Sequence, residues 1–110
     1  MLDEKRLNEQ IDWFEKNFSK YSFVQFLKFL KGEYEDYLDG KNSEGYIASL
    51  TLNWIQRDEF FEKLVKYDSR LEKLKEGIDI THPDFSKERK EDILRIGLVI
   101  INSILNEFKN

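Results

Sequence analysis

Hydrophobic residues recur with a helical period along almost the whole of this chain. Between residues 2 and 18, four of them fall at three- and four-residue intervals, which places them on one face of a helix. These four are Leu7, Ile11, Phe14 and Phe18. Trp13 lies away from that stripe. The pattern therefore predicts an amphipathic first helix with Trp13 off its apolar face.

A second amphipathic helix is predicted for residues 23–38. Its apolar face carries Phe23, Leu27, Leu30, Tyr34 and Tyr37. Ser22 stands directly before this helix and belongs to the residue types that cap helix N-termini. Residues 39–45 read DGKNSEG, and this run of turn-forming residues predicts the clearest loop of the chain.

Two further helices are predicted for residues 46–55 and 59–76. One continuous helix through both segments is the alternative, but it would place Asp58 on the apolar stripe, where burial of its charge is costly. A break at residues 56–57, with Asp58 as the N-cap of the fourth helix, avoids that cost. Gly77 then falls where the C-terminal cap of this helix belongs.

The last predicted helix, residues 87–109, is apolar around about 200° of its circumference, counted at about 100° per residue. Only a narrow strip of it is polar: Arg95, Asn102 and Asn106. A helix this apolar is expected to be surrounded by others, with Ile100 and Ile104 almost fully buried. We therefore predict an all-α fold. Residues 1–110 form one domain, a compact bundle of about five helices around the apolar C-terminal helix.

The composition argues against common catalytic chemistry. The chain has no cysteine, and His82 is its only histidine. Because these two side chains perform most nucleophilic and proton-transfer chemistry near neutral pH, we predict a protein that is not an enzyme and needs no cofactor. His82 stands between Thr81 and Pro83, and no catalytic partner is marked by its spacing. This position favours a structural place in a turn.

The charge balance bears on the expected partners. The net charge is −4 at pH 7, with 22 acidic and 18 basic residues. Nucleic-acid-binding domains usually carry a basic face, so nucleic acid is not an expected partner. The N-terminal residues lack the apolar core of a secretory signal. The longest apolar stretch, residues 93–105, is shorter than the roughly 20 residues that span a bilayer. We expect a cytoplasmic protein that does not bind membranes.

Two pairs of carboxylates match, by spacing alone, the ExxE…ExxD pattern of the all-α nucleotide pyrophosphohydrolases. They are Glu59 with Glu62 and Glu76 with Asp79. Enzymes of that kind need their carboxylates to converge on Mg²⁺. On one predicted helix, a rise of 1.5 Å per residue would hold the two pairs roughly 25 Å apart. A metal-dependent nucleotide hydrolase is therefore the least favoured hypothesis, and no metal site is predicted.

Four cations also recur at helical spacing in this region: Lys63, Lys66, Arg70 and Lys73. The pairs Glu59–Lys63 and Glu62–Lys66 are four residues apart with glutamate first, the orientation that stabilises a solvated helix. We interpret these cations as a solvent-facing stripe rather than as a phosphate-binding site.

Residues 33–46 combine carboxylates with tyrosines, and we predict a partner-binding surface there. Its residues are Phe29, Glu33, Tyr34, Asp36, Tyr37, Asp39, Glu44 and Tyr46. Aromatic side chains are enriched among the residues that dominate binding energy, and carboxylates beside them attract a basic partner. Tyr34 and Tyr37 also share the apolar stripe of the second helix, so the sequence leaves open whether they are buried or at the surface.

Small size, acidity and aromatic richness together favour a small acidic protein-binding module. The hypothesis is an inhibitor of the immunity or antitoxin type that masks a basic surface of a partner protein. The alternative is a homo-oligomeric assembly module, joined through apolar helix surface that folding leaves exposed. Trp13 and Phe29 would then lie in the self-interface. The sequence does not fix the oligomeric state.

Overall fold

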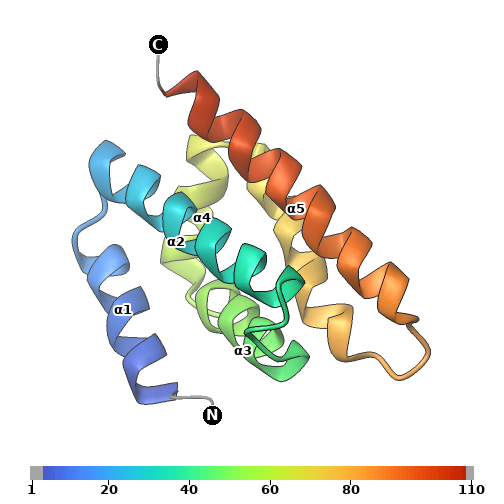
Figure 1. The fold of residues 1–110 in the computed structure, drawn as a ribbon. Helices are drawn as coiled ribbons and strands as arrows, with labels where there is room; N and C mark the ends of the chain where they lie inside the picture. The colour runs from blue at the N-terminus through green and yellow to red at the C-terminus, as the bar shows by residue number, and fades with distance from the viewer. Residues whose placement is uncertain (1–3, 109–110) are drawn as a thin grey trace.

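The regular elements of the structure, a computed structural model that describes residues 4–108, are all helices. In chain order they are α1 (Glu4–Lys16), α2 (Lys20–Leu38), α3 (Glu44–Ile55), α4 (Asp58–Tyr67), the 3₁₀ helix η1 (Ser69–Thr81) and α5 (Lys87–Glu107). The predicted all-α class is confirmed. Residues 1–3 and 109–110, which belong to the first and last predicted helices, lie outside the described residues. Figure 1 shows α2 and α5 running side by side.

Serine side chains start α2, α3 and α5. At α2, Ser19 Oγ accepts from the Ser22 backbone N–H at 3.1 Å, and Ser22 Oγ accepts from the Ser19 N–H at 2.7 Å. This reciprocal capping box satisfies two backbone donors. The prediction of Ser22 as the N-cap is therefore wrong by three residues, because Ser22 is the second partner of the box. Ser43 caps α3 and Ser86 caps α5 without a reciprocal contact. In each case the serine Oγ accepts a hydrogen bond from the backbone N–H of the residue three positions later.

The predicted fourth helix is divided in two. The break at residues 56–57 is confirmed, although Asp58 is the first residue of α4 and Arg57 occupies the N-cap position. At the other end, α4 stops at Tyr67 because Asp68 is extended and its Oδ1 accepts from the Arg70 N–H at 3.0 Å. This contact caps the 3₁₀ helix that follows. The prediction of one helix over residues 59–76 is therefore wrong.

The buried residues of η1 repeat at every third position. They are Leu71, Leu74, Gly77 and Ile80. A 3₁₀ helix has three residues per turn, so this spacing gives one continuous buried face. Runs longer than three or four residues are uncommon in this conformation. Here η1 extends over 13 residues and packs against α3, α4 and α5, so tertiary contacts support it. Gly77 lies inside η1 and is not a C-terminal cap.

Aromatic rings form the centre of the core. The buried Phe26 of α2 meets Phe14 of α1, Trp54 of α3 and Phe60 of α4 edge to face, at centroid distances of 5.3, 5.7 and 5.3 Å. Edge-to-face pairs add stabilisation beyond the area that they bury. Trp54 Nε1 is buried without a hydrogen-bond partner among the described residues. Packing alone therefore holds the Trp54 ring.

Two glycines allow the closest approaches between helices. Tyr34 is buried on α2, and its hydroxyl is hydrogen-bonded to Thr51 of α3, which in turn donates to the Ile47 carbonyl at 2.8 Å. A β-carbon added at Gly97 of α5 would lie 2.7 Å from Tyr34 Cε2. One added at Gly77 of η1 would lie 2.7 Å from Thr51 Oγ1. Neither position has room for a side chain, so these glycines set the spacing of four helices.

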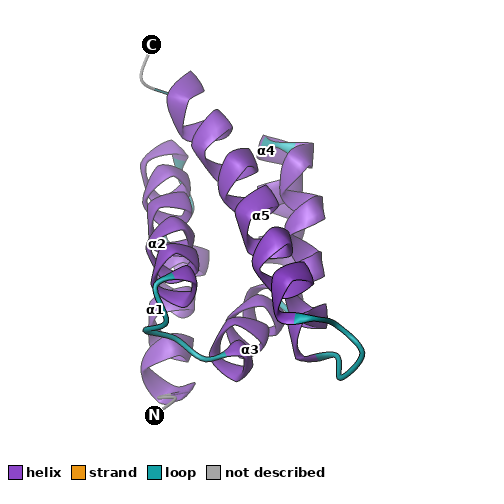
Figure 2. Cartoon of the chain, turned by 45° about the vertical axis from the view of Figure 1, so that its right-hand side comes forward, coloured by secondary structure: helices purple, strands orange, loops and turns teal. Residues whose placement is uncertain are grey.

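The C-terminal helix lies at the side of the bundle rather than at its centre. Figures 1 and 2 show α5 on the outside, and it packs against α2 and η1. Ile104 is fully buried as predicted, but Ile100 is only half-buried, and Ile96 and Val99 are 51% and 65% exposed. The prediction of a helix surrounded by others is wrong because only one of its two apolar sides has neighbours. None of the helices within residues 4–108 is both long and apolar enough to cross a membrane.

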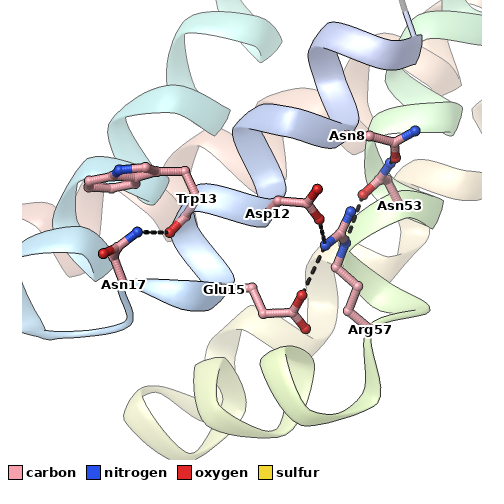
Figure 3. A network of polar contacts seen from close by, with 7 residues as sticks. All are labelled: Asn8, Asp12, Trp13, Glu15, Asn17, Asn53 and Arg57. Carbon is pink, nitrogen blue, oxygen red and sulfur yellow. Dashed lines mark hydrogen bonds and ion pairs between the residues drawn. The ribbon is translucent and has the colours of Figure 1, made fainter.

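Arg57 connects the junction of α3 and α4 to α1 through side-chain hydrogen bonds and ion pairs (Figure 3). Its Nη1 donates to Asp12 and, at 3.0 Å, to Glu15, while its Nε donates to Asn53 at 3.0 Å. Asn53 also donates to Asn8 of α1. The hydrogen bond from Arg57 holds the pKa of the Asp12 carboxyl below its usual range. This network is a polar complement to the apolar contacts of Leu7 and Ile11.

Candidate functional site

The end of α2 and the loop that follows it contain most of the predicted partner-binding residues. Helix α2 ends at Leu38 with Asp39 as its C-cap. The chain then turns at Gly40, whose φ of +81° is a left-handed conformation that glycine adopts without strain. Ser43 starts α3 soon afterwards. The short turn keeps the end of α2 close to the start of α3.

Tyr34 is not part of the surface. Only 2% of this residue is exposed, and burial raises the pKa of its hydroxyl well above the usual range. Its inclusion in the predicted binding surface is therefore wrong. Its ring fills the space beside Gly97 that the absence of a side chain creates. The helical period of α2 places Tyr34 on the apolar face, and packing against Gly97 of α5 buries its ring.

Glu33 and Tyr46 are engaged with each other and with the loop. Asn42 Nδ2 donates to Glu33 Oε2 at 2.9 Å. Burial, the nearby charge of Glu33 and a hydrogen bond with Glu33 raise the pKa of the half-buried Tyr46 to about 12. Asp36 adds to the negative potential at Tyr46. Glu33 therefore organises the α2–α3 loop as well as contributing charge.

Tyr37 and Glu44 line a cleft of about 640 Å³ together with residues from the start of α5. Lys90 of α5 donates to Glu44 Oε2 at 2.8 Å, so this carboxylate is already paired. The pKa of Tyr37 is raised by burial and by the charges of Glu44 and Glu91. Lys90 and Glu91 could not be found from the spacing of residues 29–46, because they come from a helix more than forty residues away.

Three carboxylates lie together here, and we call them the acidic end of α2: Glu35, Asp36 and Asp39. Among the described residues none of them takes part in an ion pair, and the last turn of α2 contains no cation. The C-terminus of a helix already carries partial negative charge, so carboxylates there are destabilising. Asp36 is half-buried and the other two are exposed. The helix gains nothing from these charges by itself.

Phe29 is half-buried and packs against Phe14 at a centroid distance of 5.9 Å. It belongs to the edge of the core and offers only part of its ring to solvent. The exposed aromatic residue of α2 is instead Tyr21, which is 69% exposed near the start of the helix. Trp13 on α1 is 49% exposed, in keeping with its predicted place off the apolar stripe.

A groove of about 1070 Å³ runs between α2 and α5, and we call it the basic groove. Its ten lining residues are Lys20, Tyr21, Val24, Gln25, Lys28, Lys31, Asn102, Leu105, Asn106 and Phe108. Three of them are lysines and none is acidic, in a chain whose net charge is negative. The sequence analysis did not identify this feature. The spacing of the lysines along α2 was the available signal.

The carboxylates of the ExxE…ExxD pattern lie on two helices, with Glu59 and Glu62 on α4, and Glu76 and Asp79 on η1. The single-helix argument for their separation is therefore wrong. Within residues 4–108 no three His, Asp or Glu side chains gather so as to hold a metal ion. His82 is exposed in the connector before α5, where its Nδ1 accepts from the Asp84 N–H at 3.1 Å.

Two of the four cations predicted to form a solvent-facing stripe contact other side chains. Arg70 donates hydrogen bonds to Asp68 and, at 2.7 Å, to Glu107 of α5. These bonds keep the pKa of Arg70 above its usual range. Lys63 lies over the ring of Phe18 at 5.9 Å from its centroid. At least these two therefore have intramolecular partners.

Comparison of the chain with known protein families, with curated proteins and with solved structures finds no match.

Proposed function

We propose that this chain is a small acidic protein-binding module, an inhibitor of the immunity or antitoxin type that masks a basic surface of another protein. The acidic end of α2 is its principal contact. Basic active sites and nucleic-acid-binding surfaces present clustered Lys and Arg side chains, and clustered carboxylates are their electrostatic complement.

The observation that carries this proposal is the position of the unpaired carboxylates. Glu35, Asp36 and Asp39 stand at the negative end of the α2 dipole, where they weaken the helix and meet no cation among the described residues. A partner that supplies Lys or Arg side chains would relieve this repulsion. The same charges would steer the partner during encounter and raise the association rate.

The surroundings of the acidic end support a rigid binding surface. Asn42 and Glu33 brace the loop beyond it, and the Lys90–Glu44 pair ties the start of α3 to α5. A surface that changes little on binding loses little conformational entropy. Tyr37 and Tyr46 are half-buried near the carboxylates.

Affinity capture with matched charge variants tests the proposal. The variant E35Q/D36N/D39N neutralises the acidic end, and the control E9Q/E62Q/E76Q removes the same charge from exposed positions on α1, α4 and η1. We expect the wild type and the control to capture the same basic protein from cells that carry the native genome. The first variant should capture it at least about tenfold less, the equivalent of about 1.4 kcal/mol.

Equal losses in both variants would show that net charge alone drives capture, and the named surface would be wrong. Undiminished capture by E35Q/D36N/D39N would also exclude the acidic end. Measured binding of the isolated partner should weaken with added salt, because exposed charge pairs are screened. Salt-independent binding would contradict an electrostatic contact.

A further inference from the structure

Charged side chains of opposite sign are separated along α2, on the two sides of Gly32. Lys20, Lys28 and Lys31 precede Gly32, whereas Glu35, Asp36 and the C-cap residue Asp39 follow it. This order opposes the helix dipole, which favours acids at the start and cations at the end. None of the six takes part in an ion pair within residues 4–108. Lys20 instead lies over the Phe108 ring at 5.6 Å from its centroid, and the order of the other charges does not stabilise α2 by itself.

Gly32 stands between the two halves. It is exposed on α2, and a β-carbon added there would meet nothing within 4 Å. Glycine inside a helix is less stable than alanine, so this position costs stability without a packing contact to justify it. Gly77 and Gly97 each have a neighbour that excludes a side chain, whereas Gly32 has none. The space above Gly32 is open to another molecule.

One pair of opposite charges and one pair of a neutral and an acidic side chain lie symmetrically about this glycine. Lys28 precedes Gly32 by four residues and Asp36 follows it by four, and Gln25 and Asp39 stand seven residues to either side. At 3.6 residues per turn, all four lie within about 40° of the direction of Gly32 around the helix. We call these five residues the outer face of α2.

We propose that a second copy of this chain packs against the outer face of α2, with the two α2 helices antiparallel and crossing at Gly32. A two-fold axis at the crossing brings Lys28 of each chain opposite Asp36 of the other. It likewise brings Gln25 opposite Asp39. Every contact is made twice, as in any isologous interface. The two glycines meet at the centre, where the absence of side chains lets the helix backbones approach closely.

The second copy is favoured over an unrelated partner because the outer face is complementary to itself. An unrelated partner would need charges that complement this face. It would not explain why Lys28 and Asp36 lie at equal distances from Gly32 with opposite charge. Self-association explains both the order of the charges and the exposed glycine. The inference does not rest on the proposed function. It adds that the dimer covers Asp36 and Asp39, so self-association competes with a basic partner for the acidic end.

Sedimentation equilibrium at low salt tests the dimer with charge reversals. We expect the wild type to reach twice the monomer mass as concentration rises, and K28E and D36K each to dissociate about tenfold more readily. The double variant K28E/D36K restores opposite charges across the axis and should restore the dimer. K73E, which reverses an exposed lysine on η1, is the control and should leave the dimer unchanged. Salt at about 1 M, where the Debye length is about 3 Å, should weaken the wild-type dimer.

A bulky residue at the crossing tests the geometry separately. G32L should be monomeric while keeping the circular dichroism and at least the denaturation midpoint of the wild type, because its side chain meets open space in the monomer. A wild type that stays monomeric at every concentration would overturn the proposal, as would a double reversal that fails to restore association. Dimerisation that survives K28E and G32L but is lost in V99E would place the interface on α5 and equally overturn it. Partner capture should survive K28E, which separates a failure of this inference from a failure of the proposed function.

Discussion

The substitution of glycine by alanine should have opposite effects at two helical positions of this protein. Gly97 lies inside α5 and Gly32 inside α2, so both gain helix propensity when replaced, about 1 kcal/mol at most. A β-carbon at position 97 would lie 2.7 Å from Tyr34 Cε2 and 3.3 Å from Leu74 Cδ2. At position 32 it would meet nothing. The difference between the variants therefore isolates the close approach of α5 to α2.

The size of the stability change in G97A depends on how far the neighbouring side chains can move. The Leu74 methyl can shift by a few tenths of an ångström, but the ring of Tyr34 is rigid and its hydroxyl is hydrogen-bonded to Thr51. Overpacking of this kind costs about 1–3 kcal/mol. After the propensity gain, we expect G97A to lower the free energy of unfolding by about 1–2 kcal/mol. G32A should raise it by up to about 1 kcal/mol.

Urea denaturation, followed by tryptophan fluorescence at concentrations low enough to keep the chain monomeric, measures both variants. The slope with urea should stay constant, so that midpoint shifts report stability. In a Y34L background, where the ring is absent, G97A should lose most of its penalty. A double-mutant cycle gives this coupling directly. If G97A stabilises the protein as much as G32A does, the close packing of α5 on Tyr34 is wrong.

Three further predictions concern acid stability, α5 and α1. The pKa values of Asp12 and Asp68 are lowered by their arginine partners, so the stability that they contribute is present above the unfolded value of about 3.9 and is lost as pH falls through the lower folded values. D12N and D68N should therefore flatten the loss of stability below about pH 4, and urea midpoints that still fall as steeply would contradict this. I104A should lower the free energy of unfolding by about 2–5 kcal/mol because Ile104 is fully buried. I96A, on the exposed side of α5, should change it by no more than about 0.5 kcal/mol. Equal losses in the two variants would refute the orientation of α5. R57A should accelerate amide hydrogen exchange in α1 relative to α5, and unchanged exchange would show that the polar network does not hold α1.

Much of the helical architecture could be predicted because it depends on local spacing. Phe23, Leu27 and Leu30 lie on one side of any helix that contains them, and burying that side is the dominant stabilising term. The break near Arg57 also followed locally, from the cost of burying Asp58. The 3₁₀ helix was missed because Leu71 and Leu74 fit a continuing α pattern as well as a three-residue period. Only the extended backbone at Asp68 separates the two.

The candidate site was predicted in part for the same reason. The predicted surface included Asp36 and Asp39, which lie close together at the end of α2, but it omitted Glu35 beside them. It could not show that Lys90 neutralises Glu44, since the two residues are 46 positions apart and only the folding of α5 against α3 brings them together. It also could not reveal the basic groove, because four of the ten lining residues come from the end of α5 and its C-cap.

The sequence by itself determined that the fold is all-α, where α2 and α3 lie and which of their residues share an apolar face. It did not determine which side of α5 is covered, because Leu94 and Ile101 on one side are as apolar as Ile96 and Val99 on the other. The tertiary structure decided this at Gly97, where the missing side chain admits the ring of Tyr34 and seats α5 on α2. Hydrophobic burial is non-directional and proportional to area, so it favours either side equally. Shape complementarity between distant residues makes the choice.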